Sequence, residues 1–298
     1  MSQPFLAVLG LVGFLIAPPA PWGVKGHTLA ARVAAEHLPG DVPAFFRAAA
    51  DQLIYLDPEP DRWRSRSLTE MDRAWSFDHY IDLENVPANA LQAPDRWSYL
   101  RILYEAGLEQ PERDGGFLPF RIVELYERLV TEWRLWRQAS PREREWIEAR
   151  IVNDAGILGH YVTDAAQPHH TTIHFNGWND KAPNPLGFTR DRSFHWRFES
   201  EFVDAHVSLG DVMNKSRADA RLVAGNARAA VMNYIMESHD QVENLYRIER
   251  DVSFDPDGPP TLETVSFAAA RLAAGADMLR DLWWSAWVES AQPAPEGP

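Results

Sequence analysis

Histidines and acidic residues recur at a spacing of four in two separate segments of the chain. His160 and Asp164 occur in GHYVTDAAQPHH, and His195 and Glu199 occur in SFHWRFESEF. On a helix, residues four apart project from the same face, so each imidazole lies beside a carboxylate. Such nitrogen and oxygen donors suit a hard or borderline metal ion. Together the two pairs indicate a metal site, although either pair alone is more typical of a solvated helix surface.

The composition restricts the ligands that such a site can use. The chain has 298 residues, 43 acidic and 29 basic side chains, a net charge of −14 and no cysteine. The lack of cysteine excludes disulfides, thiolate zinc sites, iron–sulfur clusters and cysteine nucleophiles. The acidic balance argues against nucleic-acid binding through a broad basic face. It does not exclude a cleft whose positive charge comes from bound metal.

The segments around these pairs have the pattern of helices joined by loops. Pro168 ends the helix that carries His160 and Asp164, and His170 follows on the turn. Asp41 is the expected N-cap of another helix. Apolar residues at helical spacing predict helices over 27–37, 41–53, 96–109, 119–138, 141–166, 193–207, 211–249 and 262–288.

The rest of the chain supports one domain. Segments 174–192 and 250–261 are rich in Asn, Asp, Gly and Pro, which predicts loops. No repeat or linker divides the sequence, so we expect a single all-α domain, a multi-helix bundle, over residues 22–290. Residues 291–298 (AQPAPEGP) are expected to form a disordered tail.

The N-terminus carries the pattern of an export signal. Residues 5–17 (FLAVLGLVGFLIA) form an apolar run that is short for a membrane span but suits the core of a signal peptide. We therefore expect residues 1–21 to be a signal peptide and the protein to be periplasmic or secreted. An uncleaved membrane anchor or a buried helix is the alternative, since the residues before this run include no Lys or Arg.

Five short motifs place the paired residues in a wider pattern. They occur in the order WGVKGH (22–27), PDRWR (60–64), DHYID (78–82), HYVTDAAQPHH (160–170) and FHWRFE (194–199). This series resembles the superfamily that contains zinc-dependent bacterial phospholipase C and the fungal and plant single-strand nucleases. The resemblance runs from Trp22 to about Val203. It implies an all-α fold with three clustered zinc ions in a cleft, and hydrolysis of phosphate esters.

The resemblance also implies the ligands of each ion. The first zinc would be held by Asp61, His79, His160 and Asp164. The second would be held by His27, by Asp164 as a bridging carboxylate, and by the amino nitrogen and carbonyl oxygen of Trp22. The third would be held by His170, His195 and Glu199. The same donor types also suit manganese or iron.

Two of these assignments have alternatives. Asp57 lies four residues before Asp61 and could substitute for it, although the PDRWR context favours Asp61. A free Trp22 amine requires cleavage immediately before Trp22, and Pro21 is unusual at a signal cleavage site. Either the chain is trimmed after cleavage at Ala20, or this zinc binds more weakly.

The resemblance implies roles in catalysis and substrate binding. A water shared by the zinc ions bridged by Asp164 would attack a phosphoryl group, and Asp61 would orient or deprotonate it. Arg64 matches an arginine that the nuclease branch places near the scissile phosphate, where its donor fork would stabilise charge. Tyr80 and Asp82 occupy positions where these nucleases stack and hydrogen-bond a base, and phospholipases have similar residues there.

The predicted activity is zinc-dependent hydrolysis of phosphodiester bonds. Arg64 favours a nuclease for single-stranded DNA or RNA. Glu199 stands where nucleases usually have Asp, which favours the alternative, a phospholipase C with a phospholipid substrate. A non-catalytic zinc-binding or storage protein is a further alternative. We expect a monomer without a stable protein partner, and surface or supporting roles for His169 and His174.

Overall fold

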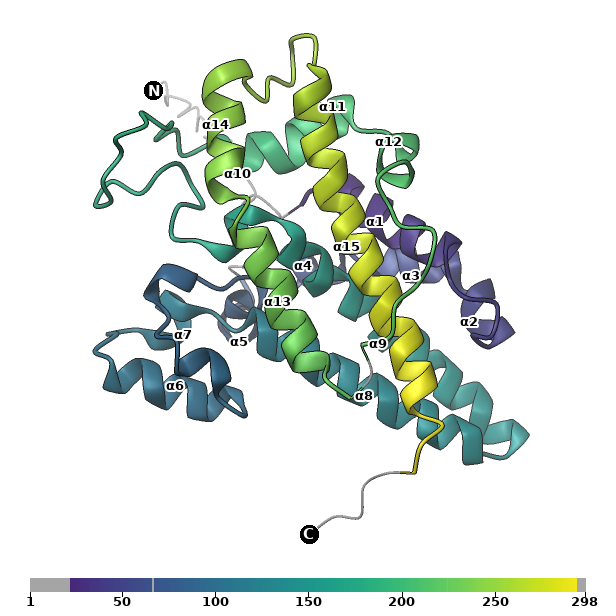
Figure 1. Ribbon diagram of the computed structural model, residues 1–298. Coiled ribbons are helices and arrows are strands. Elements are labelled where there is room, and N and C mark those ends of the chain that lie inside the picture. The colour runs from purple at the N-terminus through teal and green to yellow at the C-terminus, as the bar shows by residue number, and fades with distance from the viewer. Residues whose placement is uncertain (1–21, 66, 224, 294–298) are drawn as a thin grey trace, which may run out of the picture.

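The computed structural model describes residues 22–65, 67–223 and 225–293, and within them it is an all-helical protein (Figure 1). The nearest approach to a sheet in these residues is an isolated bridge between Ile81 and Gly116. The all-α prediction is confirmed. The expected signal peptide and residues 294–298 of the expected tail lie outside the described residues. No helix in the described ranges is long and apolar enough to span a bilayer.

Three long helices form the centre of the molecule: α8 (Leu118–Gln138), α9 (Pro141–Ala166) and α15 (Leu262–Glu289). Figure 1 shows them running side by side, with α13 (Ala227–His239) beside them. From Ile151 to Ala166 nearly every residue of α9 is buried, because apolar and small residues predominate around the helix, with His160 and Asp164 among them. A Cβ atom at Gly156 would collide with Leu56, so this glycine lets α3 (Ala50–Leu56) pack directly against α9.

Shorter helices surround this centre. The N-terminal helix α1 (Val24–Glu36) packs on α15, α3 and α9. The remaining α-helices are α2 (Ala44–Ala48), α4 (Glu59–Arg62), α5 (Thr69–Trp75), α6 (Arg96–Glu105), α7 (Pro111–Gly115), α10 (Phe194–Trp196), α11 (Val203–His206), α12 (Leu209–Met213) and α14 (Val242–Val252). Single helical turns of other types are the 3₁₀ turns η1 (Ser76–His79), η2 (Leu83–Asn85), η3 (Ala90–Gln92) and η4 (Pro168–Thr171), and the π-helical turn η5 (Arg197–Phe202).

Most predicted helices are present, but the continuous helix over 211–249 is wrong. The structure has three helices there: a non-helical stretch after Met213 separates α12 from α13, and two residues separate α13 from α14. In that stretch, the backbone amide of Arg217 donates to Asp277, and the Arg280 guanidinium of α15 donates to the backbone carbonyl of Arg217 at 2.6 Å. The buried charged side chains of α15 thus satisfy backbone groups that a helix would otherwise use.

The helix predicted over 41–53 is also wrong in part. Pro43 disfavours helical backbone in the residue before it, and α2 begins only at Ala44. Ala49 then separates α2 from α3. Asp41 is not an N-cap, since Pro43 occupies that position before α2, and the Asp41 carboxylate accepts a hydrogen bond from the indole of Trp284 at 3.1 Å. The loop predicted over 250–261 begins later, since α14 continues to Val252.

Candidate metal centre

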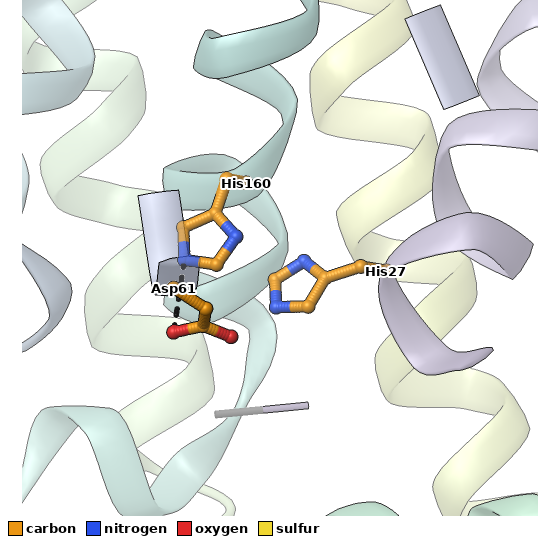
Figure 2. A group of neighbouring side chains, drawn as sticks. All are labelled: His27, Asp61 and His160. Atoms are coloured by element: carbon orange, nitrogen blue, oxygen red, sulfur yellow. Dashed lines mark ion pairs between the residues drawn. The ribbon is translucent and has the colours of Figure 1, made fainter. Parts of the chain in front are cut away.

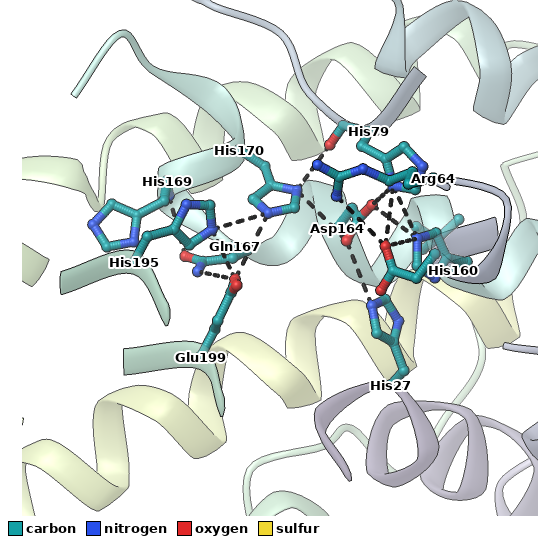
Figure 3. Close-up of polar contacts among 12 residues, drawn as sticks. His27, Arg64, His79, His160, Asp164, Gln167, His169, His170, His195 and Glu199 are labelled. Carbon is teal, nitrogen blue, oxygen red and sulfur yellow. Dashed lines mark hydrogen bonds and ion pairs between the residues drawn. The ribbon is translucent and has the colours of Figure 1, made fainter. Parts of the chain in front are cut away.

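The predicted ligand side chains converge on one region from several elements (Figure 3). Helix α9 is the common support, since it carries His160 and Asp164 and leads through Pro168 into η4 with His170. The other members each come from a different element: His27 from α1, Asp61 from α4, His79 from η1, His195 from α10 and Glu199 from η5.

The first group of donor atoms surrounds one oxygen of Asp164. His79 Nδ1 lies 2.9 Å from Asp164 Oδ2, His160 Nε2 lies 3.2 Å from it, and the two nitrogens are 3.0 Å apart. Asp61 Oδ1 is 3.9 Å from His79 and 3.8 Å from His160. Ligand atoms of a tetrahedral zinc ion with bonds near 2.0–2.1 Å are about 3.3 Å apart. Of the four residues predicted as one set, His79, His160 and Asp164 therefore lie where they could hold one ion, and Asp61 lies near both imidazoles.

The second oxygen of Asp164, Oδ1, faces His27 and His170 rather than the first group. Asp164 Oδ1 lies 3.6 Å from His27 Nε2 and 3.5 Å from His170 Nδ1. The rings of His27 and His160 stack with centroids 4.1 Å apart. Figure 2 shows that His27, Asp61 and His160 converge, and these three could also share an ion. Asp164 thus has one oxygen toward each of two donor groups, as a bridging carboxylate requires.

The third group lies on the other side of His170. His195 Nε2 is 2.8 Å from Glu199 Oε2 and 3.2 Å from His170 Nε2, so these three residues could hold an ion. His170 Nδ1 lies 2.8 Å from the backbone carbonyl of His79, and donation of its proton there leaves the Nε2 lone pair for a metal. Gln167 Nε2 donates to Glu199 Oε2 at 3.0 Å and fixes that carboxylate.

The electrostatics of the cluster fit a bound cation. Burial, reinforced by the charge of Asp164, raises the pKa of Asp61 to about 8 although His27 and Arg64 oppose the change. Asp61 Oδ1 and Asp164 Oδ1 are buried, and neither accepts a hydrogen bond from a residue in the described ranges. Buried carboxylate oxygens without donors are costly, and a metal ion would satisfy both.

The histidine pKa values divide by environment. Burial lowers the pKa of His79 and of His160 well below the usual range, which keeps both imidazoles neutral as metal ligation requires. Burial also acts to lower the pKa of His27, but the hydrogen bond and charge of Asp57 outweigh it and raise the pKa to about 9.

These shifts predict a pH dependence of metal binding. In the metal-free protein, the folded state holds a proton on Asp61 and on His27 more tightly than the unfolded state does. The stability that Asp61 contributes is full below its unfolded pKa of 3.8 and is lost as pH rises through its folded pKa of about 8. The contribution of His27 is full below 6.5 and is lost as pH rises through about 9. Metal must displace these protons, so its binding strengthens over the same range. We expect zinc to raise the Tm of chelator-treated protein by at least about 5 °C more near pH 8.5 than near pH 6.5. An equal rise at both pH values, measured by differential scanning fluorimetry, would contradict this assignment.

A cleft of about 360 Å³ opens beside the donor groups. Besides the donor residues His79, His170, His195 and Glu199, its lining comprises Arg64, Tyr80, Asp82, Arg113, Asp114, His169, Phe175 and Asn176. The Tyr80 hydroxyl donates to the backbone carbonyl of Arg113 at 2.7 Å. Gly116 follows α7 and has a φ of +75°. A Cβ there would collide with the Tyr80 carbonyl, so only glycine allows this segment to pack against Tyr80, which follows η1.

The predicted residues Arg64, Tyr80 and Asp82 all face this cleft. Arg64 lies 3.6 Å from Asp61 Oδ1, which directs its guanidinium beside the first donor group. Burial, together with the charges of Glu84 and Asp114, raises the pKa of Asp82 to about 7. The three side chains are therefore placed where a substrate of the cleft would meet them.

Trp22 is buried at the start of the described chain, with its ring centroid 5.5 Å from that of Phe198. The bond before it joins residue 21, which lies outside the described residues. Ligation by the Trp22 amine and carbonyl stays a prediction.

Sequence reasoning misplaced or missed several residues near the site. His169 is buried and lines the cleft, and neither of its ring nitrogens has a hydrogen-bond partner in the described ranges. His174 is also buried, and its ring stacks on that of Trp178 with centroids 3.7 Å apart. Of the two roles predicted for these histidines, the surface role is wrong, and the supporting role stays a prediction. Arg113 and Asp114 reach the cleft from α7, about 30 residues from the nearest motif, and no pattern in the sequence marks them.

Comparison with known proteins adds no family to this picture. A scan against protein-family models and a search of curated proteins each found no match for the chain. The functional interpretation therefore depends on the residues and geometry described above.

Proposed function

We propose that this protein is a zinc-dependent hydrolase that cleaves phosphodiester bonds in single-stranded nucleic acid. One observation carries the proposal: Asp164 lies between two groups of nitrogen and oxygen donors, directly beside a cleft that contains Arg64. Three donor groups suggest three zinc ions. Their imidazole and carboxylate donors and their 2.8 to 3.9 Å separations fit zinc.

The roles of the chain's own residues follow from their positions. Zinc, when bound, would acidify a water molecule and polarise a phosphoryl oxygen. Asp61 has a buried oxygen that can accept a proton or hydrogen bond from the attacking water. Arg64 presents a planar donor fork to the phosphate oxygens and so stabilises charge that develops during attack. About six positive charges from zinc would offset the acidic character of the chain.

The cleft lining favours a nucleic acid over a lipid. Tyr80 and Phe175 provide aromatic surface on which a base can stack, and Asp82 and Asn176 can hydrogen-bond its edge. A phospholipid tail needs an apolar wall. Besides its aromatic surface, the lining includes the cationic side chains of Arg64 and Arg113, which can bind the phosphates of a nucleic-acid strand.

We also propose that residues 1–21 are a signal peptide and that the protein is exported as a monomer to the periplasm or beyond. Removal of this segment would free the Trp22 amine for the second zinc. The apolar run over residues 5–17 supports this proposal.

Hydrolysis assays on the mature chain starting at Trp22 test the function. We expect cleavage of single-stranded DNA and RNA, bound zinc near three per chain, and loss of cleavage in chelator-treated protein that zinc restores. Phosphatidylcholine serves as the competing substrate. Head-group release from it without nucleic-acid cleavage would identify a phospholipase C. Zinc binding without turnover of any phosphate ester would indicate a storage protein, and absence of bound metal would refute the proposal.

A further inference from the structure

Asp57 is a buried carboxylate next to the metal centre that none of the three donor groups includes. It follows the last residue of α3 and is fully shielded from solvent. The C-terminus of a helix is an unfavourable position for a negative charge. Neither helix formation nor packing explains this residue.

The contact that Asp57 makes points to its role. Its Oδ1 lies 2.7 Å from His27 Nδ1, and both side chains are buried. An ionised carboxylate can only accept hydrogen bonds, so the proton of this pair lies on Nδ1 of His27. The opposite nitrogen, Nε2, is then the atom that faces Asp164 Oδ1 at 3.6 Å. The hydrogen bond fixes both the rotation of the ring and the nitrogen that can bind a metal.

The backbone around Asp57 is shaped to admit this carboxylate. A Cβ at Gly159 on α9 would collide with Asp57 Oδ2. Gly159 immediately precedes the candidate ligand His160, so the space for Asp57 is opened by the same helix that supports the metal centre. Any side chain at position 159 would push Asp57 away from His27.

We infer that Asp57 is a positioning residue that orients His27 as an Nε2 ligand, and that Gly159 provides the room it needs. Carboxylates that hydrogen-bond to a ligating histidine hold the ring in place and raise its basicity, and their loss typically costs 10- to 100-fold in metal affinity. Asp57 and Asp61 are thus not alternatives for one role: Asp61 lies among the donor atoms, and Asp57 acts through His27. The inference rests on the proposed metal site at His27 but not on phosphodiesterase activity.

The test measures zinc affinity in the full mature chain by competition with a chromophoric chelator. We expect one zinc to bind about 10- to 100-fold more weakly in Asp57→Ala, with the other zinc ions unaffected. Asp57→Asn should lose less affinity, because the amide oxygen still accepts from Nδ1. Rescue by Asn separates an orienting hydrogen bond from a need for negative charge.

A second variant breaks the same contact from the other side. Gly159→Ala should weaken the same zinc, because the new methyl group displaces the Asp57 carboxylate. Gly275→Ala is the matched control, since its Cβ would meet Ala166 and Thr163 of α9 at an ordinary 3.4 Å and would not approach Asp57. It should leave zinc affinity unchanged. Circular dichroism confirms that each variant is folded.

His27→Ala distinguishes failure of the inference from failure of the metal site. If His27→Ala loses a zinc while Asp57→Ala and Gly159→Ala keep wild-type affinity, Asp57 does not position His27. If His27→Ala also retains every zinc, then no zinc binds through His27, and both the inference and the second zinc of the proposed function are wrong.

Discussion

Asp164→Asn is expected to release zinc and to lower phosphodiester hydrolysis by about 10³-fold or more. The two oxygens of Asp164 face different donor groups, with Oδ2 at 2.9 Å from His79 and Oδ1 at 3.6 Å from His27. An amide has the same shape, but its nitrogen cannot bind a metal and its oxygen carries no full charge. One substitution therefore weakens two neighbouring sites, and elemental analysis of the purified variant measures the loss.

A second aspartate on the same helix provides the control. Asp154 lies on α9 ten residues before Asp164, is similarly buried, and pairs with Arg128 at 2.6 Å. It lines no part of the cleft. Asp154→Asn should keep wild-type zinc content and activity. If Asp164→Asn retains its zinc as well, Asp164 is not a bridging ligand and the shared-water mechanism is wrong.

The position of Asp164 beside His160 could be predicted because the sequence predicts helix α9 well. Its helical span follows from apolar periodicity, with Pro141 at the start and Pro168 beyond the end, and the structure has α9 at Pro141–Ala166. Once that span is known, the four-residue spacing of His160 and Asp164 places both on one face. Local sequence determines this part of the site, so it is visible without the fold.

Contacts between distant segments were not predictable in this way. The PDRWR motif favours Asp61 as the donor, but no local pattern encodes the turn from α3 into α4 or the space at Gly159 that place Asp57 beside His27. The stretch after Met213 has helical periodicity but is not helical, and there Arg280 donates to the backbone carbonyls of Arg217 and Asp219. Tertiary hydrogen bonds override local propensity at such positions.

The sequence motifs predict two activities, and single positions do not choose between them. Glu199 favours a phospholipase, and Arg64 favours a nuclease. The structure adds that Arg64 and Glu199 face one cleft, so a substrate would meet both. The assay with competing substrates therefore chooses between the two activities, and the role of Arg64 is tested separately.

Arg64→Ala is expected to lower kcat for single-stranded DNA by about 10²- to 10³-fold while zinc content stays at the wild-type level. Arg64 is a partly exposed cleft residue 3.6 Å from Asp61 Oδ1, and as a cation it is no metal ligand. Its donor fork would bind phosphate oxygens most strongly when charge builds on them. Arg64→Lys should recover little of the rate, because a single ammonium cannot donate in a bidentate arrangement.

Arg62→Ala is the matched control for this prediction. Arg62 lies two residues away on α4, does not line the cleft, and pairs with Glu59 near the surface. It should retain wild-type kcat and KM. If Arg64→Ala instead raises KM alone, Arg64 binds the ground state and the transition state equally and stabilises no developing charge. If Arg64→Ala loses zinc, its contact with Asp61 supports the metal centre, and the rate loss would not report on the phosphate.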